Sequence, residues 1–137
     1  MKKLFVLLFI MLNIPMFSQD LSFKKILLQT YPNDFHIKDE LIFIGTIKTE
    51  ERKLDIYENT HIFGNNRMNW KLIIVVDDKI AGWYTQIQET PTIENNKLIF
   101  PFPEEYGYMI DFSNGIPDKV WIDGEIFNFY AIETSAN

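Results

Sequence analysis

The stretch VWIDGEIFNFY, residues 120–130, predicts a tight β-hairpin near the end of the chain. Its Asp-Gly pair, Asp123 and Gly124, separates two apolar runs, and glycine adopts the positive φ of a type I′ turn without strain. With this pair as a two-residue loop, Trp121 faces Ile126, and successive side chains alternate between two faces. The face expected in the core holds Val120, Ile122, Phe127 and Phe129. The other face holds Trp121, Ile126 and Tyr130, mixed with Lys119 and Asn128.

The acids around this pair, Asp118, Asp123 and Glu125, raise the alternative of a cation site or a catalytic pair. A calcium loop needs several oxygen ligands at alternating positions, and the run KVWI that precedes the pair supplies none. The stretch therefore predicts a turn whose acids lie at the surface.

Runs rich in β-branched and aromatic residues continue back along the chain to Leu41. Clusters of Asn, Asp and Gly separate these runs, which is the pattern of an antiparallel meander. We predict a mainly β fold, at the border of α+β, in which about eight strands form a small barrel or a sandwich. The predicted strands are residues 41–48, 53–62, 68–76, 79–88, 97–102, 106–112, 119–122 and 125–132.

A second hairpin, with its loop at residues 77–78, predicts which aromatic side chains share a face. In the simplest register Leu72 faces Trp83, so Trp70 and Trp83 lie on one core face. Tyr84 then falls on the opposite face, which is half polar.

A short helix is expected before the strands, in the segment DLSFKKILLQTYPNDF. Leu21, Ile26 and Leu28 are spaced as an apolar stripe, and Pro32 ends the helix because proline lacks a backbone N–H. A helix of about ten residues is marginal alone, so it must pack on another element.

Residues 1–18 are expected to form a secretory signal peptide. Two lysines precede an uncharged run over residues 4–12, and Asn13 and Pro15 follow as helix breakers. A membrane span needs about 20 apolar residues, so this run is too short for an anchor. We expect cleavage before Gln19 and a single mainly β domain over residues 19–137. The protein would lie in the periplasm or outside the cell, without stable membrane insertion.

The composition restricts the possible partners and cofactors. The chain has no cysteine, which excludes disulfides, thiolate nucleophiles and cysteine-ligated metals. The net charge is −6, and it becomes −8 when residues 1–18, with two lysines and no acid, are removed. Basic residues do not cluster, so nucleic acid is not an expected partner. His36 lies near Asp34, but two ligands do not hold zinc, and we predict neither a metal nor another cofactor.

Catalytic candidates are few. No serine lies in a nucleophile elbow, and no glycine cluster forms a phosphate loop. Two carboxylates about 5 to 10 Å apart are enough for glycoside hydrolysis, and they leave no linear motif. The candidates are Glu50 with Glu51, Asp77 with Asp78, Glu104 with Glu105, and Asp111. Glu104 and Glu105, beside Tyr106 and Tyr108, are the weak catalytic candidates of an alternative function, a small secreted glycan-active hydrolase.

Aromatic side chains on half-polar faces favour binding over catalysis. Trp121 and Tyr130 lie on the outer face of the last hairpin, and Tyr84 is predicted on a similar face. Amphipathic aromatics on an exposed face are typical of ligand and protein sites. The opposite interpretation is that the helix or a second sheet covers these faces. We predict an exported domain that binds an unidentified small molecule or protein through Trp121, Tyr130 and Tyr84.

Overall fold

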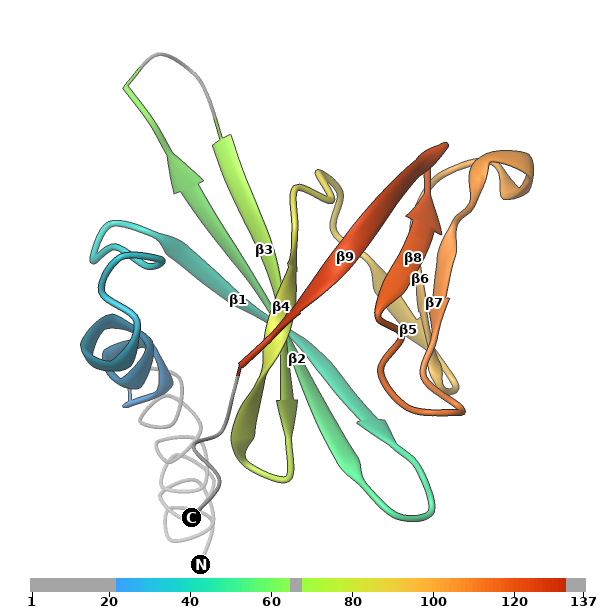
Figure 1. Cartoon of the computed structure of the whole chain (residues 1–137), viewed down its shortest axis with the longest axis horizontal. Coiled ribbons are helices and arrows are strands. Elements are labelled where there is room, and N and C mark those ends of the chain that lie inside the picture. The colour runs from blue at the N-terminus through green and yellow to red at the C-terminus, as the bar shows by residue number, and fades with distance from the viewer. Residues whose placement is uncertain (1–21, 65–67, 133–137) are drawn as a thin grey trace, which may run out of the picture. The chain divides into compact units, whose positions relative to one another are not determined.

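The computed structural model describes residues 22–64 and 68–132 and divides the chain into two units, Met1–Lys38 and Asp39–Asn137 (Figure 1). In the first unit residues 22–30 form a helix, and Pro32 follows its end as predicted. The predicted apolar stripe is wrong, because Ile26 is half exposed and the buried residue is its neighbour Leu27. Residues 1–18, the predicted signal peptide, and Leu21 lie outside the described residues.

The second unit consists of antiparallel strands, which confirms the mainly β prediction. Six strands form one sheet in the order β1-β2-β3-β4-β9-β8, and three short strands form another in the order β5-β6-β7. The two sheets form a sandwich-like arrangement that does not close into a barrel (Figure 1). The strands are β1 (Glu40–Lys48), β2 (Lys53–Ile62), β3 (Met68–Val76), β4 (Lys79–Thr85), β5 (Thr92–Glu94), β6 (Lys97–Ile99), β7 (Met109–Asp111), β8 (Lys119–Ile122) and β9 (Glu125–Ala131).

The main core lies between the two sheets, because each contributes one apolar face to it. Full burial of one large apolar side chain in this core stabilises the fold by roughly 1.5–3 kcal/mol. The predicted inner face of the last hairpin is confirmed, since Val120 and Ile122 are buried and Phe127 and Phe129 pack against the core. The other buried members are Ile47, Leu54, Ile56, Leu72, Ile74, Tyr84, Ile87, Leu98, Phe100, Ile110 and Phe112.

The β8–β9 hairpin has the predicted register. Trp121 pairs with Ile126, and Ile122 pairs with Glu125. Asp123 and Gly124 have φ values of 50° and 76°, as a type I′ turn requires. The Asp-Gly pair is therefore a turn, and it orients the outer face of the hairpin.

The predicted register of β3 and β4 is wrong beyond the first two pairs. Val75 pairs with Ile80, but Ile74 pairs with Gly82, so that Ala81 forms a bulge. Trp83 is consequently opposite Ile73 and no longer opposite Leu72. The run from Leu72 to Val76 is apolar on both faces of β3, and alternation of hydrophobicity therefore does not fix the register beside the turn.

Candidate functional site

The outer face of the β8–β9 hairpin exposes three large apolar side chains. Trp121 is 50% exposed, Ile126 66% and Tyr130 61%. Trp121 pairs with Ile126, and Tyr130 lies four residues further along β9 on the same face, roughly 13 Å away at the rise of a strand. We call these three residues the aromatic face. Two of the predicted binding residues, Trp121 and Tyr130, thus lie on one exposed surface.

The loop before β7 holds Trp121 from one side. The N–H groups of Asp123 and Gly124 donate to the carbonyl oxygens of Gly107 and Tyr106, at 2.9 and 2.5 Å. Gly107 has φ 87°, and a Cβ at this position would collide with the carbonyl oxygen of Trp121 and approach its ring. The backbone of Gly107 therefore lies directly against Trp121. The same loop carries Tyr106, which is half exposed.

Tyr130 is supported by a buried ring. It pairs with Trp83 of β4, and the two rings stack with their centroids 5.1 Å apart and an interplanar angle of 26°. Trp83 is buried, so one ring face of Tyr130 is covered by a fixed side chain. Both aromatic side chains of the aromatic face are therefore supported before any partner binds.

Tyr84, the third predicted binding residue, lies in the core. The bulge at Ala81 turns it toward the inner face, where it is fully buried. Its hydroxyl donates to the carbonyl oxygen of Pro117 at 2.6 Å, and burial raises the pKa of the Tyr84 hydroxyl. The predicted half-polar position of Tyr84 is wrong, and this residue does not contribute to the aromatic face.

Glu104 and Glu105, the predicted catalytic candidates, form the first turn of a short 3-10 helix, Glu104–Tyr106, and are exposed. They line neither of two clefts in the described part of the second unit, of about 790 and 510 Å³. The acid pair that does line the larger cleft is Glu50 with Glu51. Sequence reasoning placed that pair at a turn, but not beside a cleft.

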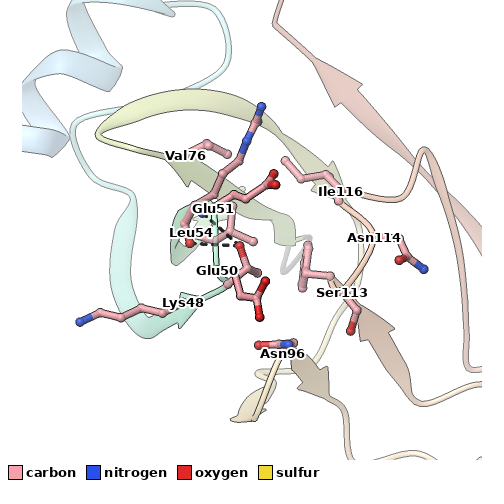
Figure 2. Close-up of a pocket in the computed structure, with 13 residues that line it drawn as sticks. Lys48, Glu50, Glu51, Leu54, Val76, Asn96, Ser113, Asn114 and Ile116 are labelled. Atoms are coloured by element: carbon pink, nitrogen blue, oxygen red, sulfur yellow. Dashed lines mark hydrogen bonds between the residues drawn. The ribbon is translucent and has the colours of Figure 1, made fainter.

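The larger cleft opens between the β1–β2 turn and the connection from β7 to β8 (Figure 2). The carboxylates of Glu50 and Glu51 point toward it, and Lys48 points away (Figure 2). Its other polar groups belong to Thr49 and Arg52 of the β1–β2 turn and to Asn96, Ser113 and Asn114, from turns of the smaller sheet and the following connection. The apolar floor is formed by Leu54, Val76, Phe112 and Ile116.

A buried carboxyl group holds the loop that follows β4. The hydroxyl of Thr90 donates to Oε1 of Glu58 at 2.9 Å, and Oε2 is buried without a partner among the described residues. Burial raises the pKa of Glu58, the charges of Glu40 and Glu89 raise it further, and the Thr90 hydrogen bond opposes them. Glu58 lines neither cleft, so we assign it a structural role.

A second polar cluster follows from a bulge in β1. The β1–β2 register shifts between Phe43 and Gly45, and this shift places Asp39 next to His61. Oδ1 of Asp39 lies 2.6 Å from Nδ1 of His61, and the Asn59 amide donates to Oδ2 at 3.0 Å. These bonds orient the imidazole ring. The sequence does not reveal this cluster, because an unshifted hairpin would place Asp39 opposite Ile62.

Residues 22–64 and 68–132 contain no group of three or more His, Cys, Asp or Glu side chains placed to hold a metal ion. The same residues contain no helix long and apolar enough to cross a membrane. No protein-family model matches the chain, and neither curated proteins nor solved structures gave a significant match.

Proposed function

We propose that this protein is an exported binding module whose aromatic face contacts a protein partner. The observation that carries the proposal is the exposure of Trp121 and Tyr130 on one face of the β8–β9 hairpin, each supported by a fixed neighbour. Binding energy in protein interfaces is concentrated in such anchors, and Trp and Tyr are the residue types most enriched among them. Because these side chains are already held in place, their ordering on binding costs little free energy.

The charges around the aromatic face favour a basic partner. Two exposed carboxylates, those of Glu104 and Glu105, lie in the 3-10 helix that ends next to Gly107, the residue against Trp121. Lys119 is the one cation of the two hairpin strands. A partner segment that alternates apolar and cationic side chains would bury its apolar groups on the face and place its charges near these acids. Its cations also gain attraction from the exposed Trp121 ring.

Export is the second part of the proposal and is supported by the order of charges, apolar run and breakers in residues 1–18. The intact mass of the protein purified from the cell envelope or the medium tests it. We expect a chain that begins near Gln19. A protein that retains residues 1–18 and stays with the membrane after a carbonate wash would contradict export.

Binding is tested by nuclear magnetic resonance with two peptides, one an octapeptide of alternating lysine and leucine and the other of alternating glutamate and leucine. We expect the first to shift the Trp121 indole signal saturably and to leave that of buried Trp83 unchanged. The acidic peptide should shift neither signal. Shifts spread evenly over the protein surface, or none at Trp121, would contradict the proposal.

A further inference from the structure

We propose that the larger cleft is a binding site for a neutral oligosaccharide. The cleft lies apart from the aromatic face, because its walls are the β1–β2 turn and the connection from β7 to β8 (Figure 2). Its volume of about 790 Å³ falls within the range of small-molecule sites, about 300–1,000 Å³. This inference does not depend on the proposed partner of the aromatic face.

The first wall of the cleft is the hydrogen-bonded turn between β1 and β2. Thr49 and Arg52 close it, because the Thr49 N–H donates to the Arg52 carbonyl at 2.9 Å and the Arg52 N–H donates to the Thr49 hydroxyl at 3.1 Å. Glu50 and Glu51 occupy the tip, and both carboxylates point toward the cleft (Figure 2). The closed turn thus presents two carboxylates, which are hydrogen-bond acceptors, on one side of the cleft.

The opposite wall supplies donors as well as acceptors. Asp111 fixes Ser113, since Oδ1 accepts the Ser113 N–H at 2.9 Å and its hydroxyl at 2.6 Å. These hydrogen bonds lower the pKa of Asp111, which keeps this acceptor ionised. The side-chain amides of Asn96 and Asn114 also line the cleft, and each offers one acceptor and two donors. Among the described residues neither side-chain amide makes another hydrogen bond that would occupy it.

This combination of groups matches the chemistry of a sugar. Every sugar hydroxyl both donates and accepts, so it pairs with carboxylates and with amides in the same site. The C–H faces of a sugar ring are apolar and match the floor formed by Leu54, Val76 and Ile116. A neutral sugar is favoured over a charged one, because the acids Glu50 and Glu51 and the cations Lys48 and Arg52 of the lining cancel in formal charge.

The positions of the acids favour binding without cleavage. Glycosidases place two carboxyl groups on either side of the scissile bond, about 5 to 10 Å apart. Glu50 and Glu51 are adjacent in one turn and approach the cleft from the same wall. The residues that line the opposite wall, Asn96, Ser113 and Asn114, carry no carboxylate.

The test is a titration of the purified protein, followed by nuclear magnetic resonance, with β-1,4-linked trisaccharides of glucose, of mannose and of N-acetylglucosamine. We expect at least one to shift the signals of Gly115 and the Asn96 side chain saturably. Glu50→Ala, at an exposed turn tip, should weaken binding at least fivefold, and Asn96→Ala should do the same. Asn128→Ala, on the outer face of β9, is the matched control and should bind like the parent protein.

Spermidine serves as a cationic probe in a parallel titration. The absence of saturable shifts at the cleft with all three sugars would overturn the proposal, and saturable shifts with spermidine alone would show that the acids select a cation instead. Sugar binding that Glu50→Ala and Asn96→Ala leave unchanged would also overturn it. The bound trisaccharide should remain intact by mass spectrometry, and its cleavage would contradict a purely binding role.

Discussion

Trp121 lies against the backbone of Gly107, and this contact joins the β8–β9 hairpin to the loop that carries Tyr106. The two segments lie 14 residues apart in the chain, yet two backbone hydrogen bonds hold them together and leave no space for a Cβ at Gly107. The aromatic face is therefore part of a fixed scaffold.

Gly107→Ala should destabilise the fold by about 1–3 kcal/mol or more, because an alanine at φ 87° is strained and its Cβ would collide with Trp121. Urea unfolding measures the loss. Gly115→Ala is a control with a positive φ of 106° and no neighbour within 4 Å, and Gly64→Ala is a second control that has neither a positive φ nor a neighbour within 4 Å. Equal losses in Gly107→Ala and Gly115→Ala would mean that the contact with Trp121 contributes nothing.

Gly124→Val should destabilise the hairpin by about 1–3 kcal/mol, because a β-branched residue is strained at φ 76°. Gly124→Asn is the matched control, since asparagine tolerates positive φ better than other side chains. Thermal unfolding of both variants provides the comparison. If Gly124→Val and Gly124→Asn lose the same free energy of unfolding, the conformation of the turn does not limit stability.

The two hairpins show what the sequence can predict and what it cannot. The Asp-Gly turn predicted the pairing of Trp121 with Ile126 correctly, because two residues fix the loop and the apolar alternation fixes the faces. The predicted register of the β3–β4 hairpin failed at Ala81, because residues 72–76 are apolar on both faces and nothing in the alternation signals a bulge. Tyr84 was misplaced for that reason.

The cleft was not predictable for a different reason. Its walls come from turns that are more than 40 residues apart in sequence, and only the packing of one sheet on the other brings Glu50 near Ser113. In the sequence, each of these turns by itself has the composition of an ordinary polar loop. Such a site follows from tertiary structure and leaves no local motif.

Tyr84→Phe should destabilise the protein by about 1–3 kcal/mol, because it leaves the Pro117 carbonyl without its hydrogen-bond donor. Tyr130→Phe is the exposed counterpart and should change stability by less than about 0.5 kcal/mol. Chemical denaturation of the two variants tests the assignment of Tyr84 to the core. A larger loss in Tyr130→Phe than in Tyr84→Phe would contradict it.

Glu58→Gln should change how stability depends on pH. Because the pKa of Glu58 is raised in the folded protein, its contribution to stability is complete below its ordinary pKa of 4.5 and is lost as pH rises through the folded pKa. Glutamine stays neutral, so the variant should gain stability relative to the parent as pH increases from 4 to 8. Glu104→Gln, at an exposed position, should show no such trend. Parallel pH profiles of parent and Glu58→Gln would refute a raised pKa.

The affinity of Trp121→Ala for the lysine-leucine octapeptide tests the central claim most directly. We expect binding to weaken at least fivefold, about 1 kcal/mol, with cooperative thermal unfolding retained. Lys119→Ala, on the same face, should bind at least as tightly as the parent because it removes a cation that repels the peptide. An unchanged affinity of Trp121→Ala for the peptide would contradict the aromatic face as the binding surface. If Trp121→Ala unfolds, Ile126→Ala replaces it, and unchanged peptide binding by Ile126→Ala would contradict the same claim.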